Sequence, residues 1–120
     1  MFVVNDYDGE VGIDIPGTGS VTLGRNQATQ VNTSGTILKV TPSGKPEASA
    51  TISNSGTYTV NSSGGIDAGS GTPAIAGKCA YSWSGSDWQI QSSGSCGSCA
   101  TKLPRSRDEI TTATKYTGCS

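Results

Sequence analysis

The stretch CAYSWSGSDWQIQSSGSCGSC, residues 79–99, contains three of the four cysteines and both tryptophans of a chain otherwise rich in serine, threonine and glycine. Two runs within it, CAYSW (79–83) and DWQIQSS (87–93), alternate apolar and polar residues on either side of the polar turn SGSD (84–87). Alternation with a period of two on both sides of a short polar turn predicts a β-hairpin. We therefore expect this segment to form two antiparallel strands.

The large side chains of the hairpin should share faces. Tyr81 and Trp83 are two residues apart, as are Trp88 and Ile90, so each pair lies on one face of its strand. A buried tryptophan removes about 150–250 Å² from water, but an isolated hairpin is still only marginally stable. We expect the neighbouring cysteines to cross-link it, because a disulfide that closes a loop of this size contributes about 2–4 kcal/mol.

The four cysteines, Cys79, Cys96, Cys99 and Cys119, allow three pairings. The hairpin register brings Cys96 within reach of Cys79 and leaves Cys99 to pair with Cys119. Pairing Cys79 with Cys99 and Cys96 with Cys119 fits almost as well, and a Cys96 to Cys99 bridge would close a very small ring. A zinc site and a thioredoxin-like redox motif are less favoured, because the chain has no histidine, no second C-x-x-C and no βαβ pattern.

Outside the hairpin, the chain continues with short runs of the same alternation, punctuated by Gly, Pro, Asn and Ser. Short strands at this spacing predict an all-β protein, a small antiparallel sandwich or barrel. The segment 106–116 predicts a helix or a strand equally well, because it combines capping-box spacing with many threonines. The expected strands are 11–17, 20–24, 35–44, 48–53 and 56–65.

The pattern divides the chain into four parts. The apolar start MFVV suits an extended N-terminal arm. The stretch from Gly64 to Gly77 has five glycines and no regular alternation, which is typical of a linker. The parts are an N-terminal arm (1–10), a β-rich core (11–63), a Gly-rich linker (64–77) and a Cys/Trp β subdomain (78–120).

Composition limits both the core and the partners. The 120 residues suffice for one domain, but only 32% are hydrophobic and 6% aromatic, so the core is small. Each ordered residue costs about 1–2 kcal/mol of backbone entropy, so we expect disulfides and symmetric partners to supply part of the stability. The net charge of −1 creates no field that would collect nucleic acid, and no apolar run approaches the ~20 residues of a membrane span.

Three smaller patterns have structural interpretations. SNSGTYTV (53–60) resembles the tyrosine corner of immunoglobulin-like domains, although Tyr58 could simply pack as a strand residue. DYDGE (6–10) resembles the start of a calcium loop but lacks the later ligands, so a turn with solvated carboxylates is expected. NTS (32–34) and NSS (61–63) fit the N-glycosylation acceptor pattern, which matters only in a secreted protein.

The spacing C-x-x-x-W, a polar turn, W, C-x-x-C and a final cysteine resembles a small Cys/Trp motif near the C-termini of uncharacterised proteins from aquatic bacteria and their bacteriophages. The family often has further cysteines and a proline-rich stretch, whereas only Pro104 follows here, so the resemblance leaves the disulfide pattern open. It implies a surface-exposed, stabilising role without catalysis. The residues that carry it are Cys79, Trp83, Trp88, Cys96, Cys99 and Cys119.

The sequence favours a structural function over an enzymatic one. Without histidine, and without a recognisable nucleophile or phosphate-binding motif, no catalytic, cofactor or metal site is expected. We expect a virion protein, a decoration or cement protein on a bacteriophage capsid, which forms a homo-oligomer with a trimer favoured. Its partners would be the major capsid protein or other virion proteins. The apolar residues Phe2, Val3 and Val4 of the arm could add a strand to a neighbour.

Two extracellular alternatives remain. In an adhesive or carbohydrate-binding module, Tyr81, Trp83 and Trp88 would form an exposed platform for a glycan. In a subunit of an extracellular filament, the arm would be exchanged between copies. MFVVNDYDGE lacks the basic and apolar regions of a secretory signal, so either a signal was removed before this numbering begins or the protein is assembled inside a cell; Met1 favours the second interpretation.

Overall fold

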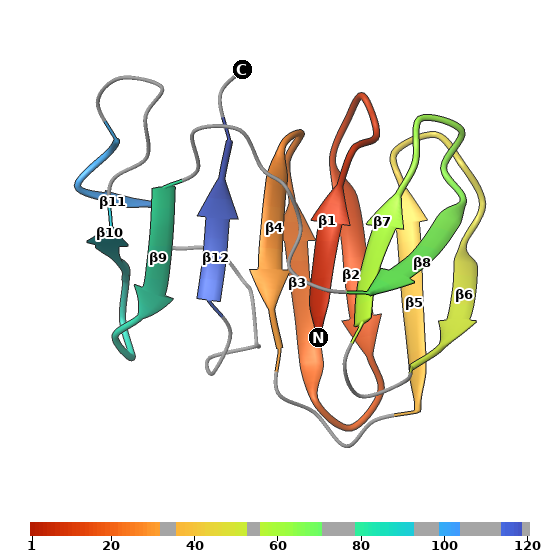
Figure 1. Cartoon of the computed structure of the whole chain (residues 1–120), viewed down its shortest axis with the longest axis horizontal. Helices are drawn as coiled ribbons and strands as arrows, with labels where there is room; N and C mark the ends of the chain where they lie inside the picture. The colour runs from red at the N-terminus through yellow and green to blue at the C-terminus, as the bar shows by residue number, and fades with distance from the viewer. Residues whose placement is uncertain (32–35, 53–55, 71–78, 93–98, 104–113, 119–120) are drawn as a thin grey trace.

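The fold was analysed in a computed structural model of the chain, which describes residues 1–31, 36–52, 56–70, 79–92, 99–103 and 114–118 (Figure 1). Every regular element among these residues is a β-strand, so the predicted all-β fold is confirmed. The strands are β1 (Phe2–Asn5), β2 (Val11–Ile15), β3 (Gly19–Leu23), β4 (Gln27–Gln30), β5 (Ile37–Pro42), β6 (Ala48–Thr51), β7 (Gly56–Val60), β8 (Ile66–Ser70), β9 (Cys79–Trp83), β10 (Trp88–Ser92), β11 (Lys102–Leu103) and β12 (Thr114–Thr117).

The strands form two sheets. The large sheet has eight strands in the order β11-β10-β9-β12-β4-β1-β7-β8, and the small sheet has four in the order β3-β2-β5-β6. Figure 1 shows the small sheet behind β4, β1, β7 and β8, so this part is a two-layer sandwich, whereas β9 to β12 continue the large sheet beyond it. Neighbouring strands are antiparallel except β1 and β7, which are parallel.

Alternation explains which side chains enter the sandwich core. In β2, residues Val11, Ile13 and Ile15 are buried, whereas the intervening Asp14 is exposed. Branched aliphatic side chains suit such a pleated, half-buried surface. The other buried aliphatic residues of this core are Val21, Leu23, Leu38, Val40 and Ile52 from the small sheet or its strand ends and Val3, Val31 and Val60 from the large sheet or its strand ends.

The N-terminal residues form an interior strand and not an extended arm. Strand β1 pairs with β4 on one side and with β7 on the other. Val3 is fully buried between the sheets, whereas Phe2 and Val4 lie on the opposite face and are half-buried. The expected arm is therefore wrong, because the backbone N–H and C=O groups of this apolar run pair with those of β4 and β7.

Asn5 fixes the turn that follows this strand. Its side chain is fully buried, and its amide Nδ2 donates to the carbonyls of Gly9 (2.8 Å) and Leu23 (3.0 Å). Its Oδ1 accepts the backbone N–H of Tyr7 at 2.8 Å. The buried amide is thus satisfied, and it connects β1 of the large sheet to β3 of the small sheet.

The glycine-rich stretch is only partly a linker. Its residues Ile66–Ser70 form β8, which pairs with β7, so the prediction for this part is wrong. The turn between the two strands explains the pairing: Oδ1 of Asn61 accepts the backbone N–H groups of Ser63 and Gly65, both at 3.0 Å. Gly64 has a φ of +85°, which glycine adopts without strain. Residues 71–77 lie outside the described residues.

The sequence predicts a helix or a strand equally well for 106–116, and the described part of this segment is a strand. Residues 106–113 lie outside the described part, and Thr114–Thr117 form β12 between β4 and β9. In the described ranges no helix exists that could span a membrane.

Candidate functional site

The Cys/Trp hairpin lies within one residue of the bounds that the sequence predicts, because its second strand covers 88–92 in place of the expected 87–93. Strands β9 and β10 are antiparallel and cover residues 79–83 and 88–92. In the turn between them, both the backbone N–H and the hydroxyl of Ser84 donate to the carbonyl of Asp87 at 2.9 Å. Gly85 supplies the positive φ, +97°, that the tight turn requires. The predicted hairpin is therefore confirmed.

All four large side chains of the hairpin share one face. Trp88 pairs directly with Trp83, and Ile90 pairs with Tyr81, so the two predicted pairs of side chains form one cluster. The two indoles meet edge to face, with ring centroids 5.4 Å apart and planes at 70°. Tyr81 and Trp88 are each only 1% exposed, whereas Trp83 is half-buried. An edge-to-face pair contributes about 0.5–1.5 kcal/mol beyond burial.

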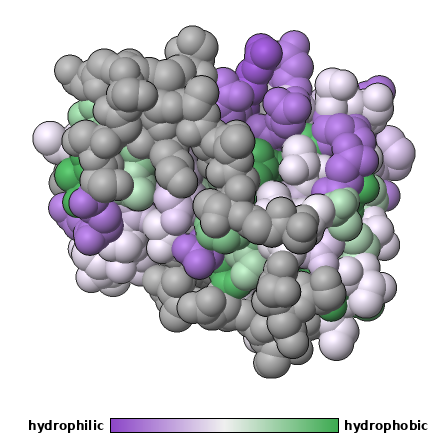
Figure 2. Space-filling view, in the orientation of Figure 1, coloured by the Kyte–Doolittle hydropathy of each residue, from purple (hydrophilic) through white to green (hydrophobic). Residues whose placement is uncertain are grey.

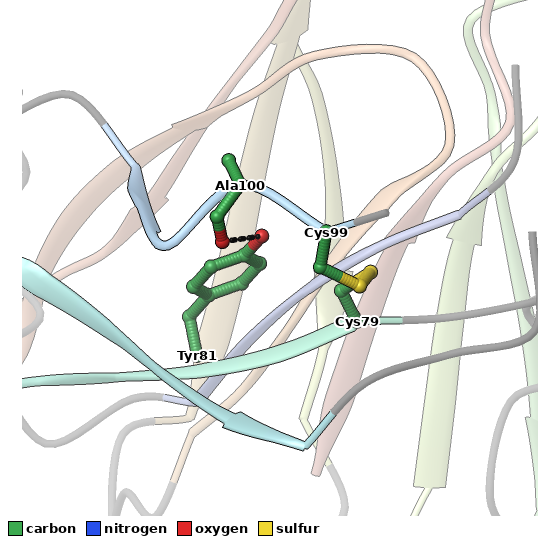
Figure 3. Close-up of a disulfide and its surroundings, with 4 residues drawn as sticks. All are labelled: Cys79, Tyr81, Cys99 and Ala100. Atoms are coloured by element: carbon green, nitrogen blue, oxygen red, sulfur yellow. Dashed lines mark hydrogen bonds between the residues drawn. A yellow bond between two sulfur atoms is a disulfide. The ribbon is translucent and has the colours of Figure 1, made fainter. Parts of the chain in front are cut away.

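A disulfide joins the start of β9 to the segment that returns across it. Cys79 pairs with Cys99, with their Cα atoms 6.1 Å apart (Figure 3). The pairing of Cys79 with Cys96 is therefore wrong, because the register fixes what lies opposite Cys79 and not how far the chain runs before it returns. Cys79 and Cys99 are not thiolates and do not ligate zinc. Cys96 and Cys119 lie outside the described residues.

The hydroxyl of Tyr81 holds the same return segment. It donates to the carbonyl of Ala100 at 2.9 Å, and Figure 3 shows this bond beside the disulfide. Leu103 and Cys99 are half-buried and pack against the core. A covalent bond and a hydrogen bond thus fasten residues 99 and 100 over the buried face of β9.

Strand β12 attaches the hairpin to the sandwich. Its Lys115 pairs with Thr29 of β4 on one side and with Tyr81 of β9 on the other. Lys115 is only 6% exposed, and its Nζ donates to the carbonyl of Thr22 on β3 at 3.3 Å. The same Nζ lies 5.5 Å from the ring centroid of Trp88, within reach of a cation–π contact. Lys115 therefore bridges both sheets and the hairpin.

Sequence reasoning did not identify Lys115. The run TKYT gives no signal of burial, and the carbonyl that Lys115 binds is 93 residues away in the chain. Two buried polar atoms nearby, Oγ1 of Thr29 and Nε1 of Trp88, have no hydrogen-bond partner within the described ranges. Within the described residues, Trp88 therefore contributes through its ring.

The two predicted sets of interaction residues lie on different parts of the large sheet. Val3 faces the sandwich core, and Phe2 packs on the opposite face against Tyr116, with centroids 6.2 Å apart. Tyr81 and Trp88 are buried in the same core as Val3. The structure therefore buries Val3 together with two of the hairpin aromatics and leaves Phe2 and Val4 on the opposite face, so the two predicted sets do not form one exposed surface.

The acidic turn after β1 is solvated. Asp6, Asp8 and Glu10 are exposed, and hydrophilic side chains gather over this turn at the top of the view in Figure 2. Asp8 pairs with Arg25 at 2.8 Å, but both side chains are mostly exposed, and such pairs contribute about 0–1 kcal/mol. Among the residues that the structure describes, no group of three or more potential metal ligands exists.

Tyr58 joins the two sheets at the opposite end of the sandwich. It is buried in β7, and its hydroxyl donates to the carbonyl of Thr51 in β6 at 3.2 Å. A tyrosine that returns to an upstream carbonyl is the interaction that the tyrosine-corner resemblance suggests.

Comparison with known proteins adds no relative. No protein-family model, curated protein or solved structure matches the chain. The function is therefore argued from the residues of the chain itself.

Proposed function

We propose that the chain is a structural protein of a bacteriophage virion, a decoration or cement protein that stabilises the capsid shell from outside. The observation that supports this most is the use of the Cys/Trp segment. In a chain with only 32% hydrophobic residues, Cys79, Tyr81 and Trp88 are buried in the same core as the sandwich. The segment therefore serves the rigidity of the module, which is what a protein that reinforces a shell requires.

The extracellular alternatives receive less support. Stacking on a sugar needs an exposed aromatic face, but Tyr81 and Trp88 are each 1% exposed and only Trp83 is partly accessible. Exchange of a free N-terminal arm between filament subunits would need β1 to leave two neighbouring strands and to expose Val3. A rigid module on a capsid surface requires neither change.

Deletion of the coding sequence from its genome tests the proposal. We expect particles that still assemble but release their DNA at a lower temperature, because a cement protein adds contacts between shell subunits. Purified chain added back should bind the outside of the shell to saturation and restore the original release temperature, whereas heat-unfolded chain should not. Native particles that contain no copy of the chain would contradict the proposal.

A further inference from the structure

The two sheets end in four edge strands, which differ in how they are protected. Natural edge strands avoid pairing with other molecules by being short, by carrying charge or by being covered. Strand β11 has two residues, β8 carries Asp67, and a carbonyl of β3, that of Thr22, is bound by Lys115. Strand β6, with the sequence ASAT, carries no charge; its last carbonyl, that of Thr51, is bound by Tyr58, and no described residue binds the backbone of Ser49.

The backbone of β6 directs some of its hydrogen-bonding groups away from β5. The N–H of Ile52 donates to the carbonyl of Thr36 at 2.9 Å, so these two residues form a hydrogen-bonded pair between β6 and β5. Because such pairs alternate in an antiparallel ladder, Ser49 and Thr51 direct their N–H and C=O groups away from β5. The Thr51 carbonyl accepts from Tyr58, which agrees with this direction.

The side chains around this edge would allow another strand to approach β6 closely. Ala48 and Ala50 are half-buried and pack against the core, and Ser49 and Thr51 are small and uncharged. Beside Thr51, on the neighbouring strand, lies Ile37, the exposed large hydrophobic residue of the described part of the chain, at 43%. Figure 1 shows β6 as the outermost strand of the small sheet.

We propose that β6 pairs antiparallel with β6 of a second copy of this chain, about a two-fold axis at Ser49. In this register the two Ser49 residues exchange N–H···O=C bonds, Ala48 faces Ala50 of the second copy, and Glu47 faces Thr51 of the second copy. No like charges oppose each other across the axis. The same arrangement of β8 would place two Asp67 carboxylates about two residues apart, roughly 7 Å at 3.4 Å per residue, which disfavours it.

The pairing joins two small sheets into one continuous sheet of eight strands. Because each copy contributes the same strand, the contact is isologous and closes with two copies. The expected trimer would need a different contact. The inference goes beyond the proposed function, because the edge pairs two copies whether or not a capsid is present.

A pair of proline variants tests the inference. Ser49→Pro removes the outward N–H at the axis of β6 without touching the ladder to β5. Ala68→Pro is the matched control: the bond from Asn61 N–H to the Gly65 carbonyl fixes the alternation in β8, so the N–H of Ala68 also faces outward. Light scattering coupled to size exclusion, over a concentration series, should give twice the monomer mass for the wild type and for Ala68→Pro. The dimer dissociation constant of Ser49→Pro should be at least about tenfold higher than that of the wild type.

Hydrogen exchange in the wild-type protein provides a second measurement in case Ser49→Pro does not fold. The amides of Ser49 and Thr51 should become protected as concentration rises through the dimer transition, and that of Ala68 should not. A wild-type monomer at every concentration, a trimer, or a Ser49→Pro dimer as tight as the wild type would overturn the inference. A monomer that still binds and protects the shell would overturn it while leaving the proposed function intact.

Discussion

The sandwich and the hairpin region bury their apolar residues in different ways. In the sandwich, the faces of β1, β4, β7 and β8 are covered by the small sheet, and most of the side chains between them are Val, Ile and Leu. In the hairpin region, formed by β9 to β12, no second sheet is present within the described residues. There the buried apolar residues are Cys79, Tyr81 and Trp88. The segment at Cys99 and Ala100 is attached over them by the disulfide and by the bond from Tyr81.

The difference shows that a disulfide-bonded segment can cover a buried face of a sheet in place of a second sheet. A second sheet covers a face without covalent help, because many strand residues bury one another. A short return segment buries little area by itself. A disulfide must therefore reduce the conformational entropy that this segment loses on folding. We therefore expect the hairpin region to depend on the sandwich, and the sandwich to be independent of the disulfide. Both tryptophans lie in the hairpin, so their fluorescence reports on that region alone.

The largest effect is expected from Ile13→Ala in the centre of the sandwich. Ile13 is 1% exposed, and truncation to alanine in a core costs about 2–5 kcal/mol of unfolding free energy. Because the hairpin region depends on the sandwich for its stability, circular dichroism and tryptophan fluorescence should show one shared unfolding transition at lower denaturant concentration. Ile13→Val is the control, with a cost of about 0.5–1.5 kcal/mol. Unchanged fluorescence in Ile13→Ala would show that the hairpin region folds by itself.

The second effect is expected from removal of the disulfide in the double variant Cys79→Ala, Cys99→Ala. The bridge spans 20 residues, and a loop of this size is worth about 2–4 kcal/mol. The loss should be local: the tryptophan transition should move to lower denaturant, while hydrogen exchange of β2 and β5 stays close to that of the wild type. Reduced wild-type protein should behave like the variant. Equal loss of protection in β2 and in β9 would remove the proposed distinction between the two regions.

The same distinction explains what the sequence could predict. The hairpin depends on neighbouring residues, and its two strands were predicted to within one residue of their observed bounds. Alternation also located β2, β3, β5, β6 and β7 to within a few residues, because each carries its own inward apolar set. Strand β4, with the sequence QATQ, carries no such set and was missed. It is a strand because β1 and β12 both pair with it.

What failed depends on partners far along the chain. The apolar run at Phe2 to Val4 predicted an extended segment correctly. Nothing in the local sequence shows that this segment pairs with β4 on one side and with β7 on the other. Strand β8 has no alternation and is defined by the turn at Asn61. The partner of Cys79 and the burial of Lys115 depend on the path of the chain after β10 and on the end of the small sheet at β3.

A smaller effect is expected at the junction between the regions. Lys115→Ala removes the stem that fills the space between Trp88 and β3 and the bond to the Thr22 carbonyl, so we expect a loss of about 1–3 kcal/mol. Lys115→Met keeps most of the stem packing and should recover part of the loss. Chemical denaturation should also separate the fluorescence and circular dichroism transitions in Lys115→Ala. Coincident transitions in this variant would mean that β12 couples the regions through its backbone alone.

The smallest effect comes from a matched pair of hydroxyl deletions, one in each region. Tyr58→Phe removes the bond to the Thr51 carbonyl in the sandwich, and Tyr81→Phe removes the bond to the Ala100 carbonyl in the hairpin region. Each bond is worth about 0.5–1.5 kcal/mol, so the two unfolding free energies should fall by similar amounts. Their locations should differ: with the disulfide reduced, Tyr81→Phe should lower the tryptophan transition further, because its bond is then the remaining attachment of Ala100 to β9. Tyr58→Phe should show no such dependence on reduction, because both ends of its bond belong to strands that the two sheets already hold in place.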